Sequence, residues 1–136
     1  MSTNVVSLRL VRKLSVMERE FGMKRYAEGM TGKSGLVIAG GLAYIVVFDP
    51  KCEEGITNQT RNSLEYLDEL LERAGSGRDK LLQVTVYLSD FSDKEAMDEV
   101  WNPWIGKPEN WPQRACVGVD LSPDYLIEIV VIAQVS

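Results

Sequence analysis

The chain has 136 residues, 45% of them hydrophobic and 26% charged, which is an ordinary composition for one globular domain spanning residues 1–136. Its 15 basic and 20 acidic residues give a net charge of −5, which argues against nonspecific binding to nucleic acid or to an anionic membrane. Histidine is absent, so the commonest general base and metal ligand has no place in its chemistry.

Its two cysteines, Cys52 and Cys116, are too few and too far apart in sequence for a disulfide framework or a zinc site. The N-terminus has no signal-peptide pattern, and no apolar run reaches the roughly 18 residues of a transmembrane helix. We therefore expect a cytoplasmic protein with reduced thiols, no membrane or nucleic-acid partner, and no metal or organic cofactor.

The first half of the chain combines strand-like segments with a stretch of little regularity. Residues 5–11 alternate and predict a strand, whereas residues 14–34 are rich in charge and glycine and predict mostly irregular structure. Residues 36–39 and 43–48 predict two strands joined at Gly40-Gly41, where paired glycines indicate a bulge or a close backbone approach.

A helix is expected next, because apolar and small residues recur at intervals of three and four, at Ile56, Thr60, Leu64, Leu67, Leu71 and Ala74. Gly75 follows as a typical residue just beyond a helix C-terminus. Residues 80–90 then alternate as a strand that places on one face Leu82, Val84, Val86 and Leu88.

The pair Ser92 and Glu95 has the spacing of a capping box. The second helix that it predicts has an apolar stripe made of Met97, Val100, Trp101 and Trp104. Pro103 is expected to end or kink this helix. The last two strands are expected at residues 115–119 and 126–135, on either side of a turn at residues 122–124.

The resulting order, β-β-β-α-β-α-β-β, predicts an α/β (α+β) domain with two helices on one face of a sheet. The final strand is apolar on both faces, and two helices cover only one face of such a sheet. A second copy of the chain is the simplest cover for the other face, so an obligate homo-oligomer is expected.

Two charged residues stand out because they lie in apolar strand segments. Arg114 follows Pro112 at the start of one strand, and Glu128 is the sole charge in residues 126–133. Buried without a partner, either charge costs free energy. One interpretation is that they pair with each other or lie on a wet sheet edge. The other is a small pocket where Arg114 binds an anionic ligand and Glu128 handles a proton.

Two further features favour structural interpretations. Gly32-Lys33-Ser34 looks like the end of a phosphate-binding loop, but Ala27 stands where that loop requires glycine. Cys116 lies in an apolar strand two residues beyond Arg114, so a buried, unreactive thiol is favoured over a nucleophile.

Longer motifs carry a family resemblance. In order they are LVIAGGLA, QTRNSLEYLDELLERAGSGRDKLLQVTVYLSD, MDEVWNPW, PQRACVGV and LIEIVVIA. Together they resemble the Rid family (reactive intermediate deaminases, also called YjgF) over roughly residues 26–135, and they look most like its YoaB-type branch.

The resemblance implies a chorismate-mutase-like fold assembled as a homotrimer, with a ligand cleft between neighbouring subunits. It implies hydrolysis of reactive 2-imino or enamine acids, such as 2-aminoacrylate, to 2-oxo acids and ammonia. Arg114 matches the family arginine that binds the substrate carboxylate, and Glu128 matches the glutamate thought to position water. The backbone at Cys116 and the side chain of Tyr26 match other substrate contacts.

Two positions depart from the family pattern. Gly40 stands where a serine is frequent, which removes a hydroxyl from the expected pocket, and Asp98 replaces a frequent asparagine and adds negative charge. Both affect the choice of substrate more than the fold. The alternatives are a non-catalytic module that binds a 2-oxo acid or another small metabolite, and an endoribonuclease, which the acidic balance and the missing histidines disfavour.

Overall fold

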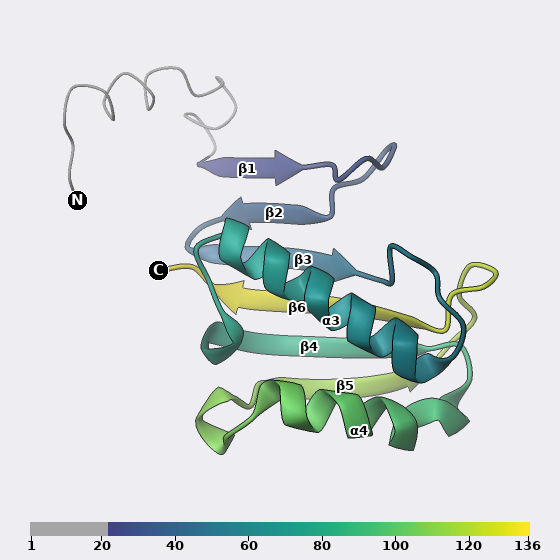
Figure 1. The fold of residues 1–136 in the computed structure, drawn as a ribbon. Coiled ribbons are helices and arrows are strands. Elements are labelled where there is room, and N and C mark those ends of the chain that lie inside the picture. The colour runs from purple at the N-terminus through teal and green to yellow at the C-terminus, as the bar shows by residue number, and fades with distance from the viewer. Residues whose placement is uncertain (1–21) are drawn as a thin grey trace.

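A six-stranded sheet with two α-helices on one face makes up residues 22–136, the part of the chain that the computed structural model describes (Figure 1). The strands are β1 (Met23–Tyr26), β2 (Leu36–Ala39), β3 (Leu42–Val47), β4 (Leu81–Leu88), β5 (Gln113–Gly118) and β6 (Ile127–Gln134). The helices are α3 (Ile56–Arg73) and α4 (Lys94–Ile105), with 3₁₀ turns η1 (Arg78–Lys80), η2 (Phe91–Asp93) and η3 (Pro108–Asn110). The predicted mixed fold, with both helices on one face, is confirmed.

The strands lie in the order β1-β2-β3-β6-β4-β5. All neighbours are antiparallel except β4 and β5, which are parallel and are connected through α4. β6, the last strand in sequence, therefore lies in the middle of the sheet, and β5 forms one edge.

The core lies between the sheet and the helices. The predicted face of α3 is the buried one: Thr60, Leu64, Leu67 and Leu71 are at most 1% exposed. Against them pack alternate residues of the strands, among them Val84, Val86, Ile127, Ile129 and Val131. Gly75 ends α3 as predicted, with a positive φ of 76°. The Gly75 N–H donates to the Glu72 carbonyl and the Ser76 N–H to the Leu71 carbonyl, which is a Schellman C-cap.

Two sequence-based expectations about strands are wrong. β1 lies in the stretch that was expected to be irregular. The prediction missed it because its four residues, MKRY, show no apolar alternation, and they form a strand by pairing with β2. In β4 the buried residue is Leu81, whereas Leu82 is 46% exposed. A bulge between Leu81 and Gln83 shifts the register against β6 and moves Leu82 off the buried face. The strand predicted at residues 5–11 lies outside the described residues.

The start of α4 also differs from the prediction. Ser92 does not cap the helix with Glu95; instead Asp90 accepts hydrogen bonds from the Ser92 backbone N–H and hydroxyl, at 2.9 and 2.7 Å. Asp93 is the N-cap residue and its side chain makes no capping bond. Pro103 lies inside the last turn of α4, which ends soon afterwards at Ile105. Trp101 is buried as expected, but Trp104 is only partly buried.

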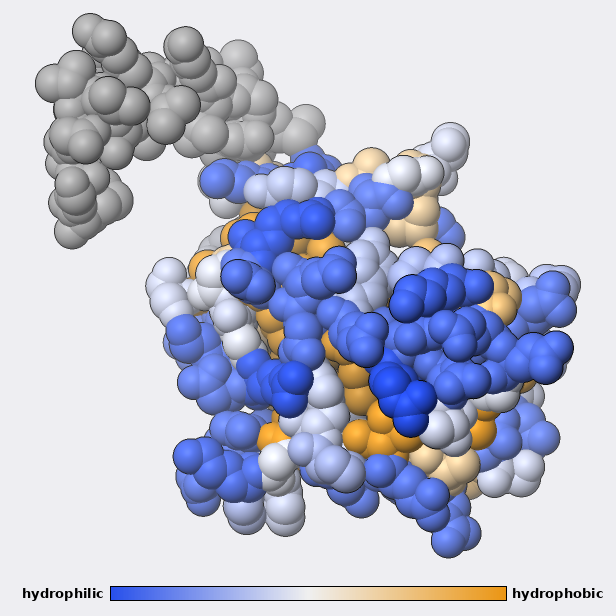
Figure 2. All heavy atoms as spheres, viewed as in Figure 1, coloured by the Kyte–Doolittle hydropathy of each residue, from blue (hydrophilic) through white to orange (hydrophobic). Residues whose placement is uncertain are grey.

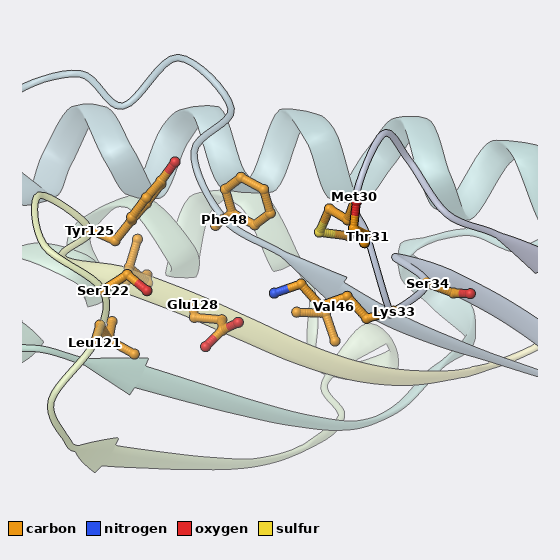
Figure 3. Close-up of a pocket in the computed structure, with 11 residues that line it drawn as sticks. Met30, Thr31, Lys33, Ser34, Val46, Phe48, Leu121, Ser122, Tyr125 and Glu128 are labelled. Carbon is orange, nitrogen blue, oxygen red and sulfur yellow. The ribbon is translucent and has the colours of Figure 1, made fainter.

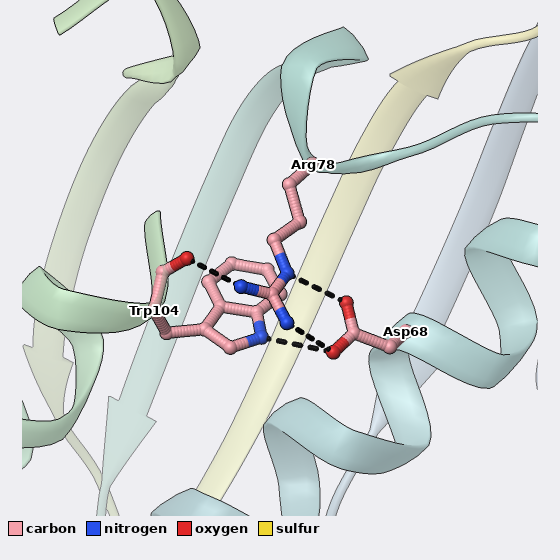
Figure 4. Close-up of polar contacts among 3 residues, drawn as sticks. All are labelled: Asp68, Arg78 and Trp104. Atoms are coloured by element: carbon pink, nitrogen blue, oxygen red, sulfur yellow. Dashed lines mark hydrogen bonds and ion pairs between the residues drawn. The ribbon is translucent and has the colours of Figure 1, made fainter. Parts of the chain in front are cut away.

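A polar cluster of Asp68, Arg78 and Trp104 joins the two helices to the start of β4 (Figure 4). The Arg78 guanidinium binds both carboxylate oxygens of Asp68, at 2.9 and 2.8 Å, and donates to the Trp104 carbonyl at 2.8 Å. Its carbon lies 4.6 Å from the centre of the Trp104 ring, and Trp104 Nε1 donates to Asp68 at 3.1 Å. This Asp68 cluster fixes α4 relative to α3.

The sheet face turned away from the helices has no cover in the described chain. Val130 and Ile132 of β6 are only partly buried there, and Tyr44 and Val117 are 43% and 41% exposed. The helix side, by contrast, is mostly hydrophilic, with apolar residues visible mainly between α3 and α4 (Figure 2). The two-sided apolar pattern of β6 thus leaves one apolar face open, as the sequence indicates.

Candidate functional site

Arg114 lies on the edge strand β5 and points toward the helix side of the sheet. It pairs in register with Val84 of β4, whose side chain is fully buried under the helices. Its own side chain is 19% exposed. Among the strands of residues 22–136, β5 pairs only with β4, and the Arg114 side chain contacts α4 at this edge of the sheet.

Helix α4 holds the guanidinium from one side. Nη1 of Arg114 lies 2.7 Å from Asp98 Oδ1 and 4.0 Å from the Met97 sulfur, and the guanidinium carbon is 5.3 Å from the centre of the Trp101 ring. The other carboxylate oxygen of Asp98 binds Lys94 Nζ at 2.8 Å. Lys94, Asp98 and Arg114 therefore form a cluster with a net charge of +1, which favours an anionic ligand.

Two opposing effects act on the pKa of Asp98. Partial burial works against ionisation, but the hydrogen bonds and positive charges of Lys94 and Arg114 outweigh it and hold the pKa below its ordinary value. Asp98 is thus ionised at neutral pH and orients Arg114 through Nη1. The substitution of aspartate for the expected asparagine gives Arg114 a fixed partner.

The other donors of Arg114 remain available. Within residues 22–136, Nε and Nη2 of Arg114 make no hydrogen bond. Beside the side chain is a cavity of about 230 Å³, lined by Trp101, Asn102, Ile105, Trp111, Pro112 and Arg114. Arg114 thus keeps a planar pair of N–H donors without an acceptor in these residues, and it lines a small, largely apolar space.

Glu128 lies in a different and larger cavity. This cavity, of about 520 Å³, is lined by Met30, Thr31, Lys33, Ser34, Val46, Phe48, Leu121, Ser122, Tyr125, Ile127 and Glu128. The carboxylate of Glu128 and the amino group of Lys33 both extend into the space between the β1–β2 loop and the β5–β6 loop (Figure 3). The floor is mostly apolar, so these two charges are its main polar features.

Arg114 and Glu128 lie on opposite faces of the sheet. Glu128 pairs with Tyr87 of β4, whereas Arg114 pairs with Val84, three residues away on the same strand. An odd separation along a strand places side chains on opposite faces. The interpretation that the two charges pair with each other is therefore wrong within one chain, and Asp98 is the partner of Arg114.

The remaining predicted site residues are spread over the fold. Cys116 lies on the same face of β5 as Arg114, and burial raises the pKa of its thiol, with the nearby Arg114 charge opposing this only in part. Tyr26 lies on β1, where the Arg73 guanidinium is 5.9 Å from its ring centre. Gly40 is exposed in the β2–β3 turn with a φ of 58°, and neither Tyr26 nor Gly40 lines either cavity.

The structure also brings in residues that the sequence did not identify. Trp111 stands beside Arg114, and its signal was slight: a tryptophan directly before Pro112. Lys33 lies opposite Glu128, although its motif matched only the end of a phosphate-binding loop. Val46 of β3 and Phe48, just after it, line the Glu128 cavity of the single chain, and Gly40 does not. The effect of Gly40 on a pocket between subunits stays a prediction.

Among residues 22–136 no group of three His, Cys, Asp or Glu side chains lies close enough to hold a metal ion. In the same residues, neither helix is long and apolar enough to cross a bilayer.

The fold and the site define a small α+β protein in which an arginine on the edge strand β5 lines a cavity. Comparison with known proteins identifies the family. The family model Endoribonuclease L-PSP matches residues 17–135. A RutC family protein of Pyrococcus horikoshii is 38% identical over 113 residues, 79% of this chain and 85% of that protein. The RutC family protein YoaB of Escherichia coli is 31% identical over 103 residues, 75% and 90% of the two chains.

Solved structures agree. A member of the YjgF protein family from Neisseria meningitidis superposes with a TM-score of 0.79, at 27% identity, over 85% of this chain and 97% of that one. A protein from Pseudomonas aeruginosa gives 0.76 at 28% identity, over 84% and 99%. The chain belongs to the Endoribonuclease L-PSP family, whose members are also named RutC and YjgF family proteins.

Proposed function

We propose that this protein hydrolyses reactive 2-imino acids, and the enamines in equilibrium with them, to 2-oxo acids and ammonia. Water adds to the imine carbon, so that a C–O bond forms and the C=N bond becomes a C–N single bond. Proton transfer to nitrogen then allows ammonia to leave as the carbonyl forms. The reaction consumes one water and needs neither oxidant nor cofactor.

The observation that carries the proposal is that, in the described part of the chain, only one nitrogen of the Arg114 guanidinium is paired. Asp98 binds Nη1 at 2.7 Å, Nε and Nη2 have no acceptor within residues 22–136, and the Arg114 side chain lines a cavity. A guanidinium edge with two parallel N–H donors matches a carboxylate bidentately. Arg114 would thus hold and orient the carboxylate that every 2-imino acid carries.

Glu128 is the candidate for activating water. Its carboxylate lies in a mostly apolar cavity, where it can accept a proton from the attacking water and return it to the leaving nitrogen. Because an imine is already electrophilic, a positioned carboxylate with no metal suffices for this step. A positioned proton-transfer group contributes about 10²- to 10⁴-fold to a rate.

A shared site requires a second subunit, because Arg114 and Glu128 lie on opposite faces of their own sheet. We therefore propose a homotrimer in which the open sheet face of one subunit meets the β5 edge of the next. Burying Tyr44, Val117, Val130 and Ile132 would remove from water the apolar face that the helices leave open. Sedimentation equilibrium at micromolar concentration is expected to give three times 15.2 kDa, and a 15.2 kDa species alone would contradict this assembly.

The role of Arg114 is tested with enzymatically generated imino acids, by following 2-oxo acid release. Arg114→Ala is expected to abolish hydrolysis and to weaken 2-oxo acid binding by about 2–5 kcal/mol, the cost of losing a bidentate charged pair. Arg114→Lys recovers little, because an ammonium lacks the fork. Arg61→Ala, an exposed arginine on α3 bound only to Asn58, is the matched control and keeps full activity.

Folding is measured on the same variants, because Lys94 still binds Asp98 when Arg114 is removed. Arg114→Ala should therefore keep its assembly and most of its stability. If Arg114 serves only to neutralise Asp98, Arg114→Ala will unfold more easily and Asp98→Asn will restore it. A double variant that is stable and fully active would end the proposal.

The shared site is tested by mixing subunits. Arg114→Ala and Glu128→Gln are each expected to be inactive, but their co-assembled mixture should regain activity at sites that combine the intact arginine of one chain with the intact glutamate of the other. Failure of the mixture, with both variants folded, would contradict a site between subunits.

A second candidate function is a non-catalytic module that binds a 2-oxo acid. The observation favouring it is that Asp98 already occupies one edge of the Arg114 guanidinium and Glu128 is remote in the same chain. Tight 2-oxo acid binding that depends on Arg114, without any acceleration of imine hydrolysis, would establish this alternative.

A further inference from the structure

The cavity beside Arg114 has walls that suit an apolar group. Trp101 and Ile105 form one side from α4, and Trp111 and Pro112 form the other from the segment before β5. Asn102 is the one lining residue with an uncharged polar side chain, and Arg114 itself supplies the charge. Two indole rings and aliphatic carbon therefore line the cavity to which Arg114 supplies the charge.

Trp111 is unusual because it is exposed and yet held in place. Trp111 is 62% exposed to solvent. Its indole N–H donates to the Gly106 carbonyl at 2.9 Å, and its backbone N–H donates to the Pro108 carbonyl at 3.1 Å. Leaving so large an apolar side chain in water forgoes the free energy of burying it, so an exposed but fixed ring that lines a cavity points to a ligand.

The neighbouring segment is braced in the same way. Asn110 Nδ2 donates to the Ile105 carbonyl at 3.0 Å, which ties the segment to the end of α4. Pro112 restricts the backbone directly after Trp111. The ring is thus pre-organised, and a ligand that contacts it need not order a mobile loop.

We propose, on the basis of the function proposed above, that this cavity binds the side chain of the substrate and selects 2-imino acids with aromatic or large aliphatic side chains over the small 2-aminoacrylate type. The carboxylate on Nε and Nη2 of Arg114 fixes one end of the substrate. The Trp101 ring centre is 5.3 Å from the guanidinium carbon of Arg114. The substrate side chain is attached close to the carboxylate that Arg114 binds, so it lies within reach of the residues that line the cavity.

The size of the cavity supports the same choice. Its volume is about 230 Å³, whereas one water molecule in the liquid occupies about 30 Å³. The methylene of 2-aminoacrylate would leave most of that space filled with water between two tryptophans. A phenyl or branched aliphatic group would displace this water and gain stacking or dispersion contact with the rings.

The test measures binding of two stable product analogues, pyruvate and phenylpyruvate, by calorimetry on the whole protein. The wild-type chain is expected to bind phenylpyruvate at least about tenfold more tightly than pyruvate, which corresponds to about 1.4 kcal/mol. Trp111→Ala should weaken phenylpyruvate about tenfold and change pyruvate less than about twofold. Trp111→Phe, which keeps an aromatic wall, should retain most of the preference.

Phe91→Ala is the matched control, because Phe91 is another exposed aromatic residue, 51% accessible, beside Gly118 at the other end of β5. It should leave the ratio of the two affinities unchanged. Equal binding of both analogues by the wild-type chain, or a ratio that Trp111→Ala does not alter, would overturn the subsite. So would a Trp111→Ala variant that changes only the sedimentation behaviour, because the ring would then be an assembly contact.

The two proposals fail differently. If both analogues bind with equal affinity and Arg114→Ala abolishes both, the carboxylate site stands and the tryptophan subsite is wrong. If neither analogue binds and Arg114→Ala has no effect on imine hydrolysis, the proposed function itself is wrong and the subsite falls with it.

Discussion

Replacing Arg78 by alanine should destabilise the fold, because this side chain contacts both other members of the Asp68 cluster. The variant loses a two-bond pair with the Asp68 carboxylate, a hydrogen bond to the Trp104 carbonyl and the stacking of the guanidinium on the Trp104 ring at 4.6 Å (Figure 4). Asp68 keeps its bond from Trp104 Nε1, so its charge is not left without a partner.

The expected loss in the free energy of unfolding is limited by the solvent exposure of the Arg78 and Asp68 side chains. The side chains of Arg78 and Asp68 are 43% and 35% exposed, so their pair contributes only about 0.5–1 kcal/mol. The hydrogen bond to the Trp104 carbonyl adds about 0.5–1 kcal/mol and the cation–π contact about the same. The free energy of unfolding is therefore expected to fall by about 2 kcal/mol. Arg78→Lys should recover less than half of this, because it keeps the charge but not the fork.

Urea denaturation followed by circular dichroism, at one fixed protein concentration, measures this change. Arg61→Ala is the control, because its one side-chain bond, to Asn58 at 3.2 Å, is exposed, and it should change the free energy of unfolding by less than about 0.5 kcal/mol. An Arg78→Ala variant as stable as Arg61→Ala would refute the reasoning, since the cluster would then make no net contribution to the joining of α3 and α4.

Other predictions concern the Arg114 cluster. Because the pKa of Asp98 is lower in the folded chain than its unfolded value of about 3.9, its stabilising contribution is complete above that pH and is lost as the pH falls through the lower folded value. The stability difference between the wild type and Asp98→Asn should therefore shrink on acidification below about pH 4 in denaturation curves, and a constant difference would argue against the ion pair. The raised pKa of Cys116 predicts slow alkylation by iodoacetamide at neutral pH, accelerating as the pH rises, and mass spectrometry showing rapid labelling at pH 7 would contradict it.

Regular periodicity is what made most of the fold predictable from the sequence. The three- and four-residue spacing of α3 identified both the helix and its buried face, and Gly75 marked its end. Errors arose where local signals were weak or were overridden. β1 is short and charged, the bulge at Leu82 inverted part of an alternating pattern, and Asp90 engaged the hydroxyl that was expected to cap α4.

For the candidate site, the sequence identified the unusual charges but not their neighbours. Arg114 and Glu128 were recognisable because each is a charge in an apolar strand, and the motifs around them indicated the family. Which face each residue occupies depends on how β5 and β6 pair with β4, and no local pattern contains that register. The partner of Arg114 is therefore Asp98, sixteen positions earlier on α4, rather than Glu128.

The sequence by itself determined an α+β fold of a recognisable family, with an apolar strand that two helices cannot cover and an arginine in an apolar strand segment. These properties follow from residue types and their spacing, which act locally. The tertiary structure alone decided that Arg114 and Glu128 face opposite sides of the sheet, and that Trp101, Trp111 and Arg114 line one cavity. Those relations depend on strand order and register, because they join segments that only the packed fold brings together.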